Sequence, residues 1–122
     1  MIIGAVKEKN KFENRVAISP EEAKNYVKSG HQVFIEKSAG LASGFPDSSY
    51  KEAGASIGTS KEILKKSQII VKIQLASSEE IKEMQPNSIL VSQVNVNDNA
   101  NLIKTLNLKK VSVFALERIP RI

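Results

Sequence analysis

The chain contains no cysteine among its 122 residues and only one histidine, His31. Without cysteine, disulfides, thiolate zinc sites and cysteine nucleophiles are excluded. No spacing is typical of a metal cluster, a two-carboxylate hydrolytic pair or a serine–histidine arrangement, and Glu79, Glu80 and Glu83 are expected on an exposed helical turn. No metal site is therefore expected, and hydrolytic acid–base chemistry is disfavoured.

Long apolar runs are also missing. The longest, Ile69-Ile70-Val71, is interrupted by Lys72, whereas a membrane-spanning helix needs about 20 mainly apolar residues. The apolar stretch at 2–6 precedes the first lysines, which reverses the order of a secretory signal. The sequence predicts no export signal and no direct membrane insertion, and a reducing cytoplasm suits a chain without cysteine.

Charge of one sign is not concentrated anywhere along the chain. Eighteen basic residues outweigh thirteen acidic ones, for a net charge of +5, but the two kinds are interleaved and only 5% of residues are aromatic. Single-strand binders instead place aromatic side chains within a basic groove. Nucleic-acid binding is therefore not expected. Interleaved charges of this kind are typical of a solvated protein surface.

Short apolar runs alternate with stretches of helical spacing, a pattern typical of β-α-β units. Strands are predicted near 2–6, 32–36, 69–74, 88–93 and 111–116. The segment 39–58 holds four of the six glycines and is expected to form a long loop leading into a short helix at 48–53. Residues 1–122 are predicted to form a single three-layer α/β domain on a five-stranded parallel sheet, flavodoxin-like or Rossmann-like.

Helix-start signals support this order. Ser19, Pro20 and Glu22 make a capping box with proline at the first helical position, and Gly30 ends the helix. The same spacing predicts two further helices, which start after Thr59 (with Glu62) and after Ser77 (with Glu80). Another helix is expected from near Asp98.

Ligands of such sheets bind beyond the carboxyl ends of the strands. Six polar residues lie at or after predicted strand ends and could meet there: Arg15, Lys72, Gln93, Asn95, Glu117 and Arg121. Arginine and lysine could bind a carboxylate or phosphate. Taken singly, Arg15 is more often a surface ion-pair partner, and Lys72 a strand-end side chain that reaches water. His31 starts a strand at the opposite end of the sheet, so a catalytic role is not expected.

Glycine-rich phosphate cradles are not recognisable. The stretch from Gly40 to Gly44 fits neither the GxGxxG dinucleotide fingerprint nor a Walker lysine motif. The predicted fold is typical of nucleotide-binding proteins, but their usual fingerprint is absent.

Four segments carry a family resemblance: RVAISP at 15–20, AGLASGFPDSSYKEAGA at 39–55, VKIQ at 71–74 and ALERIPRI at 115–122. Together they resemble the N-terminal region shared by alanine dehydrogenases and the alpha subunit of proton-translocating NAD(P) transhydrogenase. In that family the GxGxxG domain and a segment that completes the first domain come later. The resemblance therefore implies an incomplete N-terminal domain with an exposed apolar flank.

The resemblance also assigns roles to single residues. Arg15 and Lys72 match the arginine and lysine that hold the keto acid in alanine dehydrogenases, but Asn95 stands where those enzymes have a catalytic histidine. Asparagine cannot shuttle a proton, so alanine oxidation is disfavoured. Arg121, in the closing PRI, matches an arginine beside the nicotinamide of NAD(H) in the transhydrogenase branch.

The leading hypothesis is thus an N-terminal fragment of transhydrogenase subunit alpha. The complete enzyme would pass a hydride from NADH to NADP+ while protons cross the membrane, and the fragment alone would be inactive, with no cofactor bound tightly. Its expected partners are the remainder of subunit alpha, membrane subunit beta and a second copy in a homodimer. It would be cytoplasmic, peripheral to the bacterial inner membrane. The alternatives are an alanine-dehydrogenase-like keto-acid-binding domain and a non-catalytic interaction module.

Overall fold

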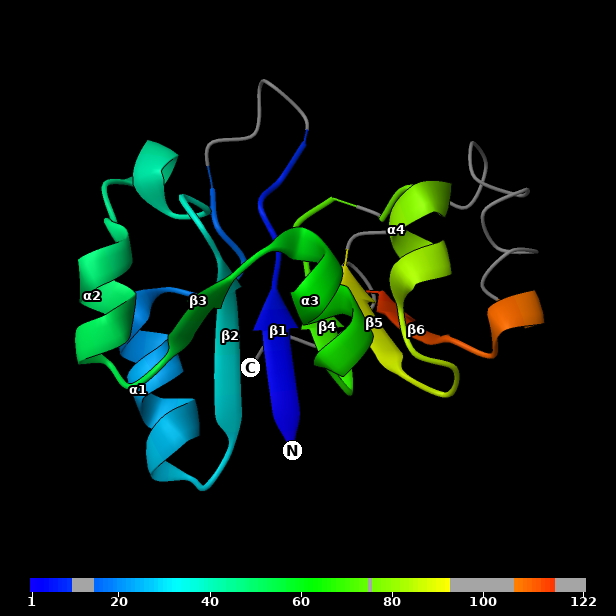
Figure 1. Ribbon diagram of the computed structural model, residues 1–122, viewed down its shortest axis with the longest axis horizontal. Coiled ribbons are helices and arrows are strands. Elements are labelled where there is room, and N and C mark those ends of the chain that lie inside the picture. The colour runs from blue at the N-terminus through cyan, green and yellow to red at the C-terminus, as the bar shows by residue number, and fades with distance from the viewer. Residues whose placement is uncertain (10–14, 75, 93–106, 116–122) are drawn as a thin grey trace.

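A computed structural model describes residues 1–9, 15–74, 76–92 and 107–115 (Figure 1). Along the chain the elements are β1 (Ile2–Ala5), α1 (Pro20–Lys28), β2 (Gln32–Glu36), the 3₁₀ helix η1 (Leu41–Ser43), α2 (Asp47–Glu52), β3 (Ser56–Gly58), α3 (Ser60–Lys66), β4 (Ile69–Val71), α4 (Ser78–Glu83), β5 (Ile89–Ser92) and β6 (Ser112–Ala115). The strands form one sheet of order β3-β2-β1-β4-β5-β6, and every pair in it is parallel. This order is that of the doubly wound dinucleotide-binding sheets, so the sheet is Rossmann-like and not flavodoxin-like.

The prediction of five strands was wrong, because the sheet has six. The additional strand, β3, consists of Ser56, Ile57 and Gly58 and pairs with β2. Because this segment has a single apolar residue, its sequence shows no recognisable strand pattern. The segment becomes a strand through its pairing with β2. The expected long loop at 39–58 therefore ends in a strand, whereas the short helix expected at 48–53 is confirmed as α2.

Helix capping follows the sequence closely. The Glu22 amide donates to Ser19 Oγ at 3.1 Å, and Glu22 Oε1 accepts from the Ser19 amide at 2.9 Å. Ser77 and Glu80 repeat this reciprocal pair at the start of α4, at 3.2 and 2.9 Å. Both capping boxes are confirmed. The helix expected near Asp98 lies outside the described residues.

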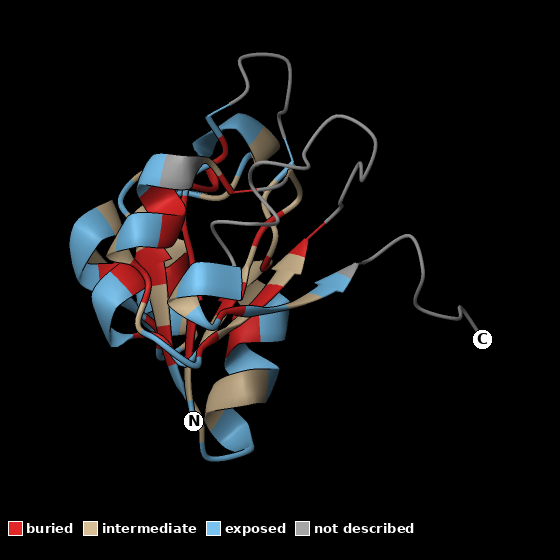
Figure 2. Cartoon of the chain, turned by 90° about the vertical axis from the view of Figure 1, so that its right-hand side faces the viewer, coloured by how far each residue is buried: buried red, intermediate tan, exposed pale blue. Residues whose placement is uncertain are grey.

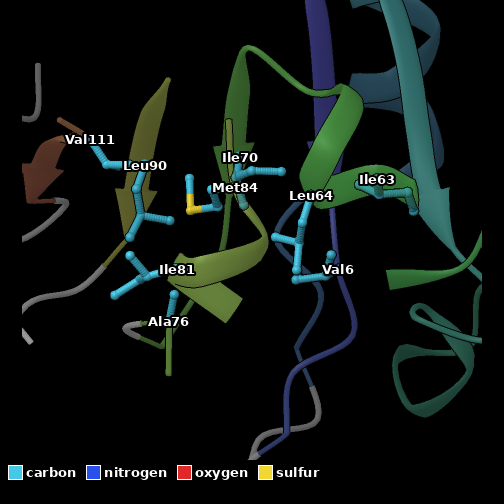
Figure 3. Packing of buried hydrophobic residues seen from close by; sticks show 9 residues of the cluster. All are labelled: Val6, Ile63, Leu64, Ile70, Ala76, Ile81, Met84, Leu90 and Val111. Carbon is cyan, nitrogen blue, oxygen red and sulfur yellow. The ribbon is translucent and has the colours of Figure 1, made fainter. Parts of the chain in front are cut away.

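One apolar core lies between the sheet and the helices α3 and α4 (Figure 3). Its members are Val6, Ile63, Leu64, Ile70, Ala76, Ile81, Met84, Leu90 and Val111. At Gly4 the helix α3 approaches the backbone so closely that a Cβ would lie 2.6 Å from Cγ2 of Ile63. Glycine at this position lets α3 pack directly on the centre of the sheet.

A second core lies on the opposite face, under α1 and α2. It contains Ile3, Ala5, Ile18, Ala23, Val33, Ile35, Ala39, Tyr50 and Ala55. Helices thus cover both faces, as a three-layer α/β fold requires. Figure 2 shows the buried residues along the central strands and the exposed ones on the outer helix surfaces. Among the described residues, no helix has the length and apolar character needed to cross a bilayer.

The described helices leave part of one face of the sheet uncovered. On the face of α1 and α2, the β4–β6 half carries only partly buried apolar side chains, Ile69, Val71, Ile89 and Val91, and Phe114, which is 54% exposed. We call these five residues the open apolar half. The strand-to-strand register places all five on one side of the sheet. The right-handed crossovers explain the asymmetry, because they put α1 and α2 over β1–β3 only.

Candidate functional site

The strand order reverses between β1 and β4, and the polar residues that follow these two strands meet at the carboxyl edge of the sheet. From β1 the chain continues into Lys7 and Glu8, and from β4 into Lys72. Open α/β sheets bind ligands at such a reversal point. This edge is therefore the place to look for a functional site.

Lys72 is buried in this edge and does not reach water. Only 1% of the residue is exposed. Its Nζ lies 3.5 Å from Glu8 Oε1 and 3.5 Å from Glu80 Oε2, and both carboxylates are almost fully buried too. The interpretation of Lys72 as a strand-end side chain that reaches solvent was wrong, because two carboxylates replace water around its ammonium group.

Glu8 also fixes the backbone that follows β4. Its Oε2 accepts a hydrogen bond from the Ile73 amide at 3.1 Å, and its Oε1 accepts from the Gln74 amide at 3.0 Å. These two amides would otherwise continue a strand ladder, which explains why β4 ends at Val71 and not at residue 74 as predicted. One side chain thus joins the ends of β1 and β4.

Arg15 lies beside the same edge, on the surface. It lines a cavity of about 210 Å³ together with Lys7, Glu8, Ser38, Ala39, Leu41 and Ala42. Because Glu8 lines this cavity and also pairs with Lys72, the structure brings Arg15 and Lys72 to one edge of the sheet. Their ligand-binding role remains a prediction.

Tyr50 packs against Gly40, which lies in the chain between the cavity residues Ala39 and Leu41. Its hydroxyl donates to the Ile18 carbonyl at 2.7 Å in the buried interior. Burial, followed by the nearby carboxylates of Glu22 and Asp47, raises the pKa of Tyr50 from 10.0 to about 12. A Cβ at Gly40 would lie 2.8 Å from the Tyr50 ring, so this glycine makes room for the tyrosine.

A second hollow, of about 400 Å³, lies on the face of α1. Its lining is mainly apolar: Ile3, Ala17, Glu22, Tyr26, Ile69, Val71, Lys72, Ile73 and Val91. Three of these residues belong to the open apolar half. The hollow is therefore the place where that half meets α1, and its lining suits an apolar side chain better than a charged ligand.

Four of the predicted site residues, Gln93, Asn95, Glu117 and Arg121, lie outside the described part of the chain. His31 lies at the amino end of β2, where its Nδ1 is 3.3 Å from the N-terminal amine of Met1. It is thus at the opposite end of the sheet from Lys72, as the sequence predicted. In the described ranges, no three histidine, aspartate or glutamate side chains are grouped to hold a metal ion.

Sequence reasoning missed the two carboxylates around Lys72. Glu8 gave no signal of this role because it lies among interleaved basic and acidic residues, and Glu80 was expected on an exposed turn but is 3% exposed. The Ser77–Glu80 capping box was a signal that fixes Glu80 at the start of α4. It could not indicate that the free oxygen of Glu80 faces Lys72, because that depends on how α4 packs against β4.

The chain is similar in sequence to known proteins over almost its whole length. The family model for the alanine dehydrogenase/PNT N-terminal domain matches residues 4–122. NAD(P) transhydrogenase subunit alpha of Haemophilus influenzae is 40% identical over 122 residues, covering 100% of this chain and 24% of that protein. Alanine dehydrogenase of Methanococcus maripaludis is 37% identical over 120 residues, covering 98% of this chain and 32% of that protein.

Solved structures agree with the sequence matches. A transhydrogenase from Sinorhizobium meliloti superposes with a TM-score of 0.94 at 32% identity, over 100% of this chain and 36% of that one. An L-alanine dehydrogenase gives a TM-score of 0.89 at 31% identity, over 94% and 32% of the two chains. The chain spans about a quarter to a third of these relatives' lengths. The chain therefore belongs to the family of the alanine dehydrogenase and PNT N-terminal domain.

Proposed function

We propose that the chain is the N-terminal part of an NAD(P) transhydrogenase subunit alpha and does not bind a keto acid. The observation that carries the choice is the enclosure of Lys72 by two carboxylates. A keto-acid site needs cations free to bind the ligand carboxylate. Since Glu8 and Glu80 already surround the ammonium group of Lys72, we do not expect this cation to bind a ligand carboxylate.

The complete protein would transfer a hydride from NADH to NADP+ coupled to proton translocation, a chemistry that the nicotinamide cofactors supply. Arg121 is proposed to contact the nicotinamide end of NAD(H). Asn95 would line the former substrate pocket, where its amide cannot act as a proton shuttle.

We do not expect the described residues to hold a dinucleotide by themselves. Gly40, the most closely packed glycine of the glycine-rich segment, lies against Tyr50, and the segment carries no GxGxxG fingerprint. We therefore assign the tight binding of NAD(H) to the remainder of subunit alpha and expect this chain alone to be inactive.

The open apolar half supports the proposal that further polypeptide completes this domain. Apolar strand faces are normally covered in proteins of this class, and Phe114 is more than half exposed. The remainder of subunit alpha would supply that cover, with membrane subunit beta and a second copy as further partners. Through that complex the chain would be cytoplasmic and peripheral to the bacterial inner membrane.

A chimaera tests this function. Residues 1–122 would replace the matching N-terminal segment of the Haemophilus influenzae subunit alpha, which is 40% identical, and be expressed with its beta subunit. Membranes should then reduce an acetylpyridine analogue of NAD, and Arg121→Ala should lower the rate without loss of assembly. A properly assembled chimaera without this activity, or an Arg121→Ala variant with an unchanged rate, would contradict the proposal.

A second candidate, keto-acid binding, is favoured by one observation. Glu8 connects the Arg15 cavity with Lys72, so the two cations named by the family resemblance do lie at one edge. Titration of the chain with pyruvate, followed by NMR, should shift resonances of Arg15 and Lys72 if this candidate holds. The leading proposal expects no such shifts at millimolar pyruvate.

A further inference from the structure

The amino edge of the sheet, where the strands begin, is rich in lysine. The chain starts at this edge, at the end marked N in Figure 1. Helices that connect parallel strands run back against them, so the described helices end at this edge. Two exposed or half-exposed lysines, Lys109 and Lys110, directly precede β6. Five exposed lysines belong to the last turns of α1, α2, α3 and α4: Lys28, Lys51, Lys65, Lys66 and Lys82. We call these seven lysines the basic edge.

Little negative charge offsets the basic edge. In the part of the chain that the structure describes, the acidic residues at this end of the sheet are Glu52 and Glu83, which close α2 and α4. Glu83 lies 4.0 Å from Lys65. The acidic residues of the first helical turns lie at the opposite, carboxyl edge. Charges that are interleaved in the sequence are therefore sorted by the fold.

Lysines in the last turn of a helix also stabilise the helix dipole, so they do not by themselves indicate a partner. The independent observation is Leu108, which is 87% exposed and directly precedes Lys109 and Lys110. The Lys109 ammonium group donates to the Lys82 carbonyl at 3.1 Å. This bond holds the segment of Leu108 beside the end of α4, so a large apolar side chain projects into water among lysines.

We propose that the basic edge binds the surface of a bilayer that contains anionic phospholipids, without crossing it. Lysine side chains are attracted to an anionic leaflet, and Leu108 would enter the boundary between headgroups and acyl chains. A nucleic acid fits less well, because within the described ranges neither arginine nor an exposed aromatic side chain lies at this edge. This inference goes beyond the proposed function, since it requires neither hydride transfer nor a cofactor.

The geometry suits such a surface. The sheet has six strands, and neighbouring strands lie about 4.8 Å apart, so the edge is about 24 Å long. It can therefore contact several headgroups at once. The carboxyl edge, with Glu8 and Lys72, lies at the other end of the strands and would face away from the bilayer.

Cosedimentation of the 122-residue chain with lipid vesicles tests the proposal. Vesicles of mixed phosphatidylglycerol and phosphatidylcholine should bind the chain at low salt and release it at high salt, because salt screens exposed charges. The triple variant Lys28→Gln, Lys51→Gln and Lys110→Gln should bind about a hundredfold more weakly, since each lysine near an anionic surface contributes about fivefold.

The matched control removes three exposed lysines from the opposite edge, in Lys9→Gln, Lys37→Gln and Lys61→Gln. Both triple variants lower the net charge equally, so a difference between them reports where the vesicle binds. The control should retain most of the wild-type affinity. If the two triple variants bind the mixed vesicles equally, the basic edge is not the binding surface and the proposal is overturned.

A second pair of variants separates lipid from other anionic partners. Leu108→Ala should weaken vesicle binding by at least about threefold, whereas Leu41→Ala, at an exposed leucine of the carboxyl edge, should not. If Leu108→Ala binds as the wild type does, the edge recognises negative charge alone and the assignment to a lipid surface is wrong.

One arm needs only the wild-type chain. Vesicles of phosphatidylcholine alone should bind it far more weakly than the mixed vesicles. Equal binding to both would point to the open apolar half, which needs no anionic lipid, and would overturn the proposal. Failure of the proposed function is a separate outcome, because it is measured as hydride transfer in the chimaera.

Discussion

Removal of the Lys72 charge is expected to destabilise the protein strongly, because two buried carboxylates depend on it. In Lys72→Met a side chain of similar length and volume replaces the lysine, so packing is largely kept. The variant leaves Glu8 and Glu80 buried without their shared cation, which lies 3.5 Å from each in the wild type. Breaking a buried ion pair by removing one partner costs about 3–5 kcal/mol. The total stability of a domain is only about 5–15 kcal/mol.

Urea unfolding followed by circular dichroism measures this loss. Lys65→Met is the control, because Lys65 is 68% exposed and lies 4.0 Å from Glu83. A surface pair of this kind contributes about 0–1 kcal/mol. The double variant Lys72→Met with Glu80→Gln should recover part of the loss, because one of the two uncompensated charges is removed and the glutamine oxygen can still accept from the Ser77 amide. Glu8 is left unchanged, because both of its oxygens accept backbone amides. If Lys72→Met unfolds within about 1 kcal/mol of Lys65→Met, the reasoning on the buried charges is refuted.

Two further predictions concern the cores. Tyr50→Phe should cost about 1–3 kcal/mol in urea unfolding, because the buried Ile18 carbonyl loses its donor. The wild type should also lose stability between pH 10 and about pH 12, because the raised pKa of Tyr50 favours folding only while the phenol is neutral. Tyr50→Phe should lack this alkaline loss of stability. An equal loss in both proteins would show that Tyr50 is not its cause. Gly4→Ala should lower the melting temperature strongly, because its Cβ would enter the Ile63 side chain; unchanged melting would show that α3 can shift.

Much of the fold was predictable because its signals are local. The capping boxes at Ser19 and Ser77 depend on residues three positions apart, and both form as predicted. The apolar runs of the five expected strands are a property of the sequence itself, and such runs are typical of strands in parallel sheets. The strand β3 has no such run, since its three residues become a strand through pairing with β2.

The candidate site was predictable only in part. That Arg15 and Lys72 approach one edge follows from the rule that parallel strands end on the same side. The burial of Lys72 and its pairing with two carboxylates could not be predicted, because the partners come from 64 residues earlier in the chain and from the next helix. Interactions over such separations are decided by packing, which no local pattern encodes.

The sequence by itself determined the α/β class, the helix starts and the family resemblance, because periodicity, capping and motif spacing act between near neighbours in the chain. Only the tertiary structure decided that Lys72 is enclosed by Glu8 and Glu80 and that the described helices leave half of one sheet face uncovered. Both depend on which strands become neighbours and on which face each crossover helix packs. The burial of a charge is a property of that arrangement and not of the residue.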